Sequence, residues 1–160
     1  MKRESGAKQG LKKGKVSVLV AKSEPLAREV LVSLLRDEGF DVVGRAGRLD
    51  ELIARMRADA PAWVVTETAL IGDPAPLLGA LAKMKPSPGV VVYVRPEADD
   101  VHSVLEAGFS AYLHGSDRLV ELFRCLRPAG GLEPYYSPRL REMARELGVT
   151  GLPARSQSAA

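Results

Sequence analysis

The sequence predicts an α/β domain built on an open, doubly wound parallel sheet with helices on both faces. Short apolar runs rich in β-branched residues recur along the chain, and segments with helical periodicity separate them. Runs without polar alternation are typical of strands buried on both faces, as happens when helices cover a parallel sheet. Strict alternation of strand and helix then favours right-handed crossovers and a three-layer domain, with functional residues beyond the carboxyl ends of the strands.

Five strand–helix units follow one another along the chain. The expected strands are 16–21, 40–43, 63–66, 90–94 and 110–113. The expected helices are 26–35, 49–58, 76–84, 101–107 and 117–126. The first helix shows how these bounds arise, because Pro25 stands near its first turn and Gly39 follows its end.

An extra helix is expected at 138–147, with Ser137 as its N-cap, Pro138 at its first position and Gly148 past its end. Its apolar stripe consists of Leu140, Met143, Ala144 and Leu147. A helix this short is not stable alone, so the stripe must be buried. The stripe either packs back on the domain or contacts a second chain or another partner. Association is favoured because the Pro/Gly-rich segment 128–137 lets the helix stand away from the sheet.

The composition is that of one compact domain with tails: 160 residues, 46% of them hydrophobic and 27% charged. We expect a disordered basic tail at 1–14, the domain at 15–127, a linker and amphipathic helix at 128–147, and a second disordered tail at 148–160. Residues 1–15 hold six Lys and Arg against Glu4, which is +5, and the remainder is −2. The net charge of +3 thus comes from the tail, and it does not indicate a basic binding face on the folded body.

Several classes of function are excluded or disfavoured. No run approaches the ~20 apolar residues of a membrane span, and the polar amino end has no signal-peptide core, so we expect a cytoplasmic protein. Cys125 is the only cysteine and has no metal-ligand spacing with His102 or His114. We expect no metal, no cofactor and no catalytic residue.

The remaining catalytic patterns are weak as well. The chain lacks both the Gly-rich dinucleotide fingerprint and the phosphate-binding loop of nucleotide-dependent enzymes. Close neighbours in sequence rarely form a catalytic triad, so His114, Ser116 and Asp117 do not indicate one. Ser116 or Asp117 is more simply the N-cap of the helix at 117–126.

Four segments, in the right order and spacing, resemble the receiver domain of bacterial two-component response regulators. They are Val18-Leu-Val-Ala-Lys-Ser-Glu-Pro-Leu-Ala-Arg28, Pro61-Ala-Trp-Val-Val-Thr-Glu67, Val90-Val-Val-Tyr-Val-Arg95 and Ala107-Gly-Phe-Ser-Ala-Tyr-Leu-His-Gly115. The resemblance covers about 15–127 and implies a three-layer, flavodoxin-like (βα)5 fold. Gly130-Gly131 and Tyr136-Ser-Pro138 look like the linker of regulators that carry a C-terminal helix-turn-helix, whereas no helix-turn-helix follows in this sequence.

The chemistry of an active receiver, as the resemblance implies it, is missing here. The acid pair that holds Mg²⁺ falls on Lys22 and Ser23, and the phosphorylated Asp falls on Glu67. The hydroxyl residue that ends the fourth strand falls on Val94, and the Lys that ends the fifth strand falls on Gly115. An ammonium group stands where the metal ion belongs, so we expect neither Mg²⁺ binding nor phosphotransfer. A metal site that combines Glu24 with Glu67 is a minor alternative.

Two alternatives stay open at this degenerate site. Glu67 either imitates the phosphorylated state permanently or pairs with Lys22 in place of the metal, and the pair is favoured because burying either charge alone is costly. Tyr112 falls where active receivers place a switching aromatic side chain, and a half-buried Tyr that fills the sheet edge is an equally good interpretation.

The sequence therefore predicts a phosphorylation-independent, atypical response regulator that is no enzyme and acts in signal transduction by binding another protein or a second copy of itself. By resemblance, its output or dimer face comprises His102, Glu106, Tyr112, Arg118, Glu121 and Cys125. Structurally, His102 is also expected to be solvated and Cys125 to pack as a small apolar residue.

The main alternative is a transcriptional or DNA-associated accessory protein that uses the basic N-terminal tail, although nucleic acid is not the favoured partner. An enzymatic or small-ligand role on this sheet has no supporting cluster of residues.

Overall fold

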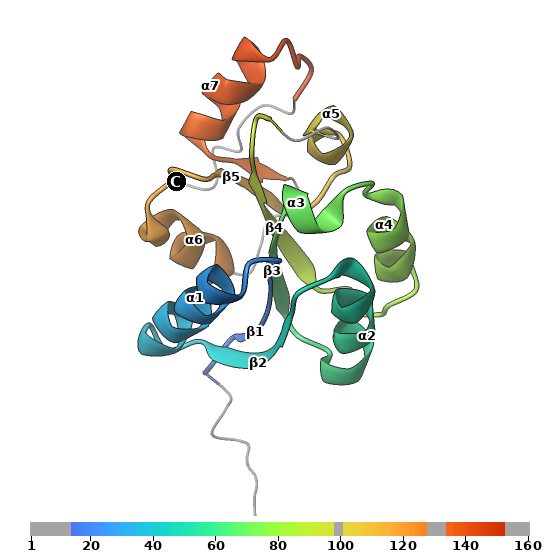
Figure 1. Ribbon diagram of the computed structural model, residues 1–160, viewed down its shortest axis with the longest axis vertical. Coiled ribbons are helices and arrows are strands. Elements are labelled where there is room, and N and C mark those ends of the chain that lie inside the picture. The colour runs from blue at the N-terminus through green and yellow to red at the C-terminus, as the bar shows by residue number, and fades with distance from the viewer. Residues whose placement is uncertain (1–13, 98–100, 128–133, 153–160) are drawn as a thin grey trace, which may run out of the picture.

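The computed structural model describes residues 14–97, 101–127 and 134–152 and contains one six-stranded parallel sheet in the order β2-β1-β3-β4-β5-β6 (Figure 1). The strands are β1 (Ser17–Ala21), β2 (Asp41–Ala46), β3 (Trp63–Glu67), β4 (Gly89–Val94), β5 (Ala111–His114) and β6 (Tyr135–Tyr136). The helices are α1 (Pro25–Asp37), α2 (Leu49–Asp59), α3 (Thr68–Ile71), α4 (Ala75–Ala82), α5 (Val101–Leu105), α6 (Leu119–Leu126) and α7 (Pro138–Glu146). This is the doubly wound α/β fold that the sequence predicts.

Two layers of helices cover the sheet, as the continuous apolar strands require. One face packs against α1 and α6 through a core that includes Val20, Leu35 and Leu122. The other face packs against α2, α4, α5 and α7 through a larger core that includes Leu19, Leu52 and Val92. Figure 1 shows α1 and α6 on one side of the strands and α2 and α4 on the other. Both faces of β1 are therefore buried, which explains its lack of polar alternation.

The predicted strands and helices are present with bounds shifted by a few residues, and two short elements were not predicted. One is α3, a single turn directly after β3. The other is β6, which pairs in parallel with β5 so that Ala111 faces Tyr135 and Tyr112 faces Tyr136. The segment expected to be a linker thus adds a sixth strand to the sheet, although residues 128–133 lie outside the described part of the chain.

The prediction that α7 stands away from the sheet is wrong. Leu140 and Ala144 are fully buried, Met143 is nearly so, and Leu147 packs partly against the same core. The short connection between β6 and α7 leaves the helix beside β5, where its apolar stripe meets the strands. Val149 is also buried, and its backbone N–H donates to Ala144 O at 2.9 Å. The ordered body therefore extends past residue 148, where a tail was expected.

Helix capping follows the predictions at α7 and departs from them at α6. Ser137 caps α7 by accepting a hydrogen bond from Leu140 N–H, with Pro138 at the first position. The N-cap position of α6 is Arg118, which makes no side-chain capping bond. Ser116 and Asp117 are thus not its N-cap, because the Asp117 carboxylate accepts from His114 N–H instead. Among the described residues, no helix has the length and apolar content needed to cross a bilayer.

Candidate functional site

The carboxyl ends of β1 and β3 bring Lys22, Ser23 and Glu67 together. The two strands are neighbours in the sheet, so Glu67 at the end of β3 meets the residues that follow β1. Lys22 Nζ lies 3.3 Å from Glu67 Oε1. The backbone N–H of Ser23 donates to Glu67 Oε2 at 2.9 Å, and Ser23 Oγ lies 3.0 Å from the same oxygen. Both carboxylate oxygens therefore have partners.

The ion pair is partly shielded from solvent, with 18% of the Lys22 side chain and 15% of the Glu67 side chain exposed. Burial raises the pKa of Glu67, but the hydrogen bonds from Ser23 and the positive charge of Lys22 outweigh burial and hold the pKa below its ordinary value. Glu67 is thus an ionised carboxylate at neutral pH. The structure contains the Lys22–Glu67 pair that the sequence favoured.

Tyr93 also borders this site, and the sequence did not predict it. Lys22 Nζ lies 5.2 Å from the centre of the Tyr93 ring, within the range of a cation–π contact. The parallel register places Glu67 of β3 directly beside Tyr93 of β4, so the ring lies next to the ion pair. Burial raises the pKa of Tyr93, so its phenol is neutral. Only the register between β3 and β4 places Tyr93 at the site, and that register cannot be predicted from the sequence of either strand alone.

Backbone contacts fix the loop that carries Lys22. Its N–H donates to Ala46 O at 3.1 Å, and its carbonyl oxygen accepts from Arg28 Nη1 at 2.8 Å. The Arg28 guanidinium in turn lies against Gly47, where an added Cβ would stand 2.8 Å from Arg28 Nη1. The small residue at 47 thus leaves room for the arginine that holds the loop.

The site does not fit a divalent cation. Mg²⁺ requires several free oxygen ligands. Here the Lys22 ammonium contacts the Glu67 carboxylate and takes the place that a metal ion would have to occupy. Glu24 does not join Glu67, because its Oε1 caps α1 by accepting from Ala27 N–H at 2.6 Å. Within the described ranges, no group of three His, Cys, Asp or Glu side chains could hold a metal ion.

The other two positions of the degenerate site, Val94 and Gly115, provide no polar side chain. Val94 ends β4 and is fully buried, so it presents no polar group. Gly115 follows β5 and is exposed, with no atom other than its chain neighbours within 4 Å of an added Cβ. The cluster therefore consists of a structural ion pair with hydrogen bonds, and it lacks both a nucleophile with a base and an anion-binding set of donors.

The six residues of the expected output face do not form one surface. Tyr112 is fully buried, not half-buried as the sequence suggested. His102 on α5 and Glu106 directly after it are exposed. On the opposite side of the sheet, α6 or the residues next to it carry Arg118, Glu121 and Cys125. The sheet edge between α5 and α6 is occupied by β6, whose Tyr135 hydroxyl lies 3.0 Å from Glu121 Oε1.

Two hydrogen bonds and a stacked ring hold the Tyr112 side chain in place. Its hydroxyl donates to Val104 O at 2.7 Å and accepts from Phe109 N–H at 2.9 Å. Its ring stacks on Tyr136 of β6, and the Tyr136 hydroxyl donates to Leu105 O at 3.1 Å. An outward rotation of the Tyr112 side chain would break both hydrogen bonds and the stack on Tyr136.

Asp117 links the end of β5 to the start of α7 and was not identified as a functional residue. Its side chain is only 4% exposed. Its Oδ2 accepts from His114 N–H at 2.8 Å and from Ser137 Oγ at 2.5 Å, and Arg139 Nε lies 3.8 Å from its Oδ1. One buried carboxylate thus ties together three segments and anchors α7 on the body.

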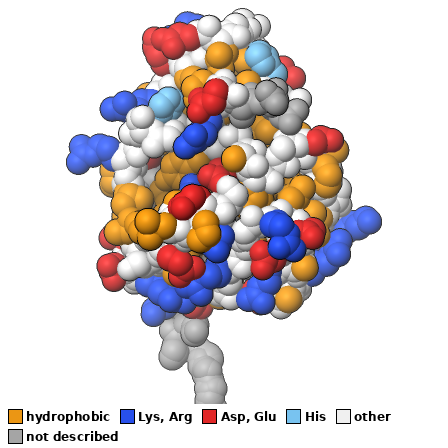
Figure 2. All heavy atoms as spheres, viewed as in Figure 1, with side chains coloured by type: hydrophobic (Ala, Val, Ile, Leu, Met, Phe, Trp, Pro, Cys, Tyr) orange, Lys and Arg blue, Asp and Glu red, His pale blue; other side chains and the backbone are white. Residues whose placement is uncertain are grey.

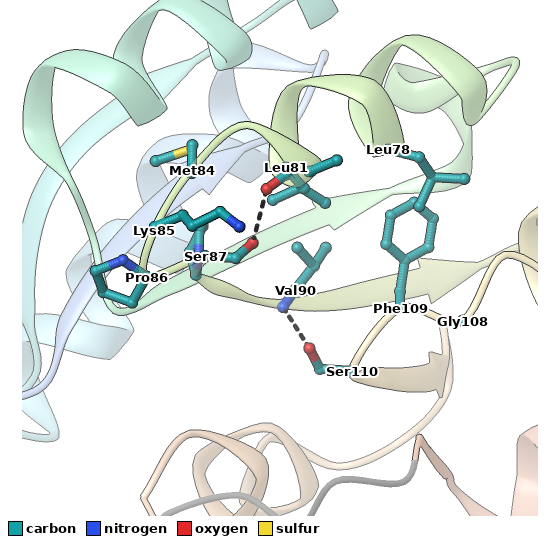
Figure 3. Close-up of a pocket in the computed structure, with 12 residues that line it drawn as sticks. Leu78, Leu81, Met84, Lys85, Pro86, Ser87, Val90, Gly108, Phe109 and Ser110 are labelled. Carbon is teal, nitrogen blue, oxygen red and sulfur yellow. Dashed lines mark hydrogen bonds between the residues drawn. The ribbon is translucent and has the colours of Figure 1, made fainter.

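Two hollows lie away from the ion pair. One, of about 550 Å³, opens at the amino ends of β4 and β5, at the opposite edge of the sheet from Glu67. Its apolar wall includes Leu78 and Phe109, and its hydroxyls are used within the protein, with Ser87 Oγ donating to Leu81 O and Ser110 Oγ accepting from Val90 N–H (Figure 3). A second, of about 530 Å³, lies between α7 and the ends of β4 and β5. The ionisable side chains that line the second hollow include Arg139, Glu142 and His114, and the His114 Nδ1 accepts a hydrogen bond from Ser116 N–H.

Part of this chain is similar in sequence to a bacterial regulatory protein. No family model matches the chain. The transcriptional regulatory protein PdtaR of Mycobacterium tuberculosis is 31% identical over 97 residues, which are 60% of this chain and 47% of that protein. The chain thus spans about half the length of the curated relatives that it matches.

Solved structures with a similar fold include receiver domains and response regulators. The receiver domain of the putative response regulator NarL from M. tuberculosis is 25% identical with a TM-score of 0.57, over 68% of this chain and 90% of that one. A LuxR-family two-component response regulator from Aurantimonas has a TM-score of 0.67 at 20% identity, over 85% and 99% of the two chains. The isolated receiver domain of RcsB from Salmonella enterica serovar Typhimurium has a TM-score of 0.63 at 16% identity, over 81% and 98%. The chain therefore has the receiver-domain fold of the two-component response regulators.

Proposed function

We propose that this chain is a phosphorylation-independent response regulator that acts in signal transduction by binding other protein chains, without catalytic turnover. The observation that carries the proposal is the Lys22–Glu67 ion pair, closed by the two hydrogen bonds from Ser23. A carboxylate with both oxygens engaged is a poor nucleophile, and the ammonium beside it excludes the metal ion that would neutralise a transferring phosphoryl group.

The packing around Tyr112 supports the same proposal from a second place in the fold. In active receivers, as the resemblance implies, an aromatic side chain at this position moves as the switch operates. Here Tyr136 stacks on Tyr112 and Val94 provides no hydroxyl to attract it. With neither a chemical input nor a movable aromatic, the domain holds one conformation, and its signal depends on what it binds.

A phosphorylation experiment on the full chain tests the proposal. Incubation with acetyl phosphate and Mg²⁺, followed by intact-mass measurement, is expected to give no adduct, and beryllium fluoride is expected to leave the amide NMR spectrum unchanged. A variant that restores all five positions, with Lys22→Asp, Ser23→Asp, Glu67→Asp, Val94→Thr and Gly115→Lys, is the matched control and should gain a Mg²⁺-dependent adduct. A saturable, Mg²⁺-dependent adduct on the unaltered chain would defeat the proposal.

Two observations favour an alternative, namely a DNA-associated accessory protein. A relative is named a transcriptional regulatory protein, and residues 1–15 carry a charge of +5. Residues 1–13 lie outside the described part of the structure. A basic segment that contacts several phosphates gives an affinity that falls steeply with salt. Salt-dependent DNA binding that disappears when residues 1–13 are removed would establish this alternative.

A further inference from the structure

An apolar hollow of about 550 Å³ lies where the carboxyl end of α4 meets the amino ends of β4 and β5. A volume of this size and a mostly apolar wall are typical of sites that bind small molecules. Figure 3 shows Leu78 and Phe109 on one side of the hollow and Met84 and Lys85 on the other. The hollow is thus a candidate ligand site, at the opposite edge of the sheet from the degenerate receiver site.

The helices on this face of the sheet leave part of the core uncovered at the hollow. Leu78, Leu81 and Met84 pack against the core, yet each keeps part of its surface exposed to solvent. All three side chains line the hollow. In Figure 2, hydrophobic side chains reach the surface over α4, at the right of the view. Single exposed apolar residues need no explanation, whereas apolar surface gathered in one hollow is typical of a binding site.

The charged groups at the hollow are positive. Lys85 lies exposed at the rim and makes no ion pair with any described residue. Lys83, two positions earlier, makes none either. Among the described residues that line the hollow, none is acidic. An apolar wall with a free ammonium at its rim is complementary to an anionic ligand that has an apolar body.

Ser110 adds a hydroxyl donor to the wall. Its Oγ accepts a hydrogen bond from Val90 N–H at 2.9 Å, and its own proton has no acceptor among the described residues. Ser87 differs, because its Oγ already donates to Leu81 O at 3.3 Å. A carboxylate accepts hydrogen bonds from hydroxyl groups and pairs with an ammonium, so it fits the polar groups of the hollow better than a cation does.

We propose that this hollow binds a small monocarboxylic acid with an apolar body, of the kind found in medium-chain fatty acids. The apolar body packs against Leu78, Leu81 and Met84, and the carboxylate lies toward Lys85. This goes beyond the proposed function and does not depend on it, because it assigns a ligand to a domain whose receiver chemistry is missing. Ligands of open parallel sheets are expected at the carboxyl ends of the strands, so the sequence did not indicate a site at the amino ends.

Titration of the full chain with sodium octanoate at pH 7, followed by amide NMR, tests the proposal. Because the hollow opens to solvent and the ligand is small, we expect a dissociation constant of about 1 mM. The amide resonances of Val90, Gly108 and Ser110 should shift and saturate. Octylammonium has the same apolar body with the opposite charge, and it should bind at least about fivefold more weakly. No saturable shift of these resonances at about 20 mM octanoate overturns the proposal, and so does equal binding of the two compounds.

Two pairs of variants test the wall and the charge separately. Lys85→Glu should weaken octanoate binding at least about fivefold, whereas Lys83→Glu makes the same change at an exposed residue outside the lining and should have little effect. Ala82→Trp should fill the hollow and abolish binding, and Ala75→Trp is its control at an exposed position of the same helix.

Thermal unfolding verifies that each variant is folded, which is expected because all four changed residues are exposed. Octanoate affinity that survives both Lys85→Glu and Ala82→Trp overturns the proposal. Equal weakening by the two lysine variants overturns the assignment of the carboxylate to Lys85. None of these results affects the phosphorylation experiment, which decides the proposed function separately.

Discussion

The rings of Tyr112 and Tyr136 lie parallel, 3° apart in plane with centroids separated by 4.8 Å, so a residue of β6 closes the space beside the central aromatic of β5. Each hydroxyl also bonds to a carbonyl oxygen of α5, Tyr112 to Val104 and Tyr136 to Leu105. The last described strand is thus joined to α5 through two aromatic side chains. This arrangement makes β6 and α7 part of the domain, in place of a linker.

The Tyr112 hydroxyl is expected to contribute measurably to stability. Tyr112→Phe keeps the ring stack but leaves Val104 O and Phe109 N–H without their buried partner, which should cost about 1–3 kcal/mol in the free energy of unfolding. Tyr93→Phe is the matched control, because the Tyr93 hydroxyl makes no hydrogen bond to any described residue, and it should change stability by less than about 0.5 kcal/mol. Urea denaturation gives both values, and equal losses would show that the Tyr112 hydrogen bonds add nothing.

The burial of α7 leads to a second prediction. Leu140 is fully buried, so Leu140→Ala should destabilise the protein by about 2–5 kcal/mol through lost apolar contact and a cavity. Leu26→Ala makes the same change at a side chain that is 70% exposed and should cost less than about 0.5 kcal/mol. Similar small losses at both positions would mean that α7 is detached from the body in solution.

Much of this fold is predictable because the strands are continuous apolar runs and the helices have regular apolar spacing. The four residues of α3 are too few to show a helical period, and the two residues of β6 are too few to show a strand. The stripe of α7 predicts that one side must be buried but not which surface buries it. That surface is created by β5 and β6, which meet only in the folded chain.

The candidate site was partly predictable for a similar reason. Lys22 and Glu67 follow strands whose order the fold class fixes, so their contact could be inferred from position and charge. Tyr93 required the register between β3 and β4, and Asp117 required knowledge of where Ser137 lies. Both depend on distances between segments that are separate in sequence, and no local pattern encodes those distances.

The Lys22–Glu67 pair should show strong energetic coupling. Glu67→Gln leaves a partly buried ammonium without its counter-charge and should destabilise the fold by about 2–3 kcal/mol, less than a fully buried pair because both side chains keep some solvent contact. Adding Lys22→Met should recover much of this loss. Chemical denaturation of the two single variants and the double variant measures the coupling, and purely additive losses would mean that the side chains do not interact.

The lowered pKa of Glu67 predicts how stability depends on pH. A carboxyl group whose pKa is depressed by folding stabilises the protein above its ordinary pKa, and this contribution is lost as the pH falls through the lower pKa of the folded state. Unfolding measured from pH 7 down to pH 3 should therefore show a smaller decline for Glu67→Gln than for the unaltered protein. Parallel curves for the two proteins would contradict the assignment of a depressed pKa.

Cys125 is expected to be an unreactive thiol. Burial, with the negative charge of Glu121 as a smaller cause, raises its pKa to about 12. Its ordinary value is 9.0, so the reactive thiolate should be about a thousandfold scarcer in the folded protein than in the unfolded chain at pH 8. Reaction with a chromogenic disulfide reagent should accordingly be at least about a hundredfold slower in buffer than in urea.

Val120→Cys in a Cys125→Ser background places a thiol at a half-exposed position of the same helix and should react at the rate of the unfolded chain. Rapid labelling of Cys125 in protein that keeps its native circular dichroism would show that α6 opens readily, and that the core beneath it is less firmly packed than the structure indicates.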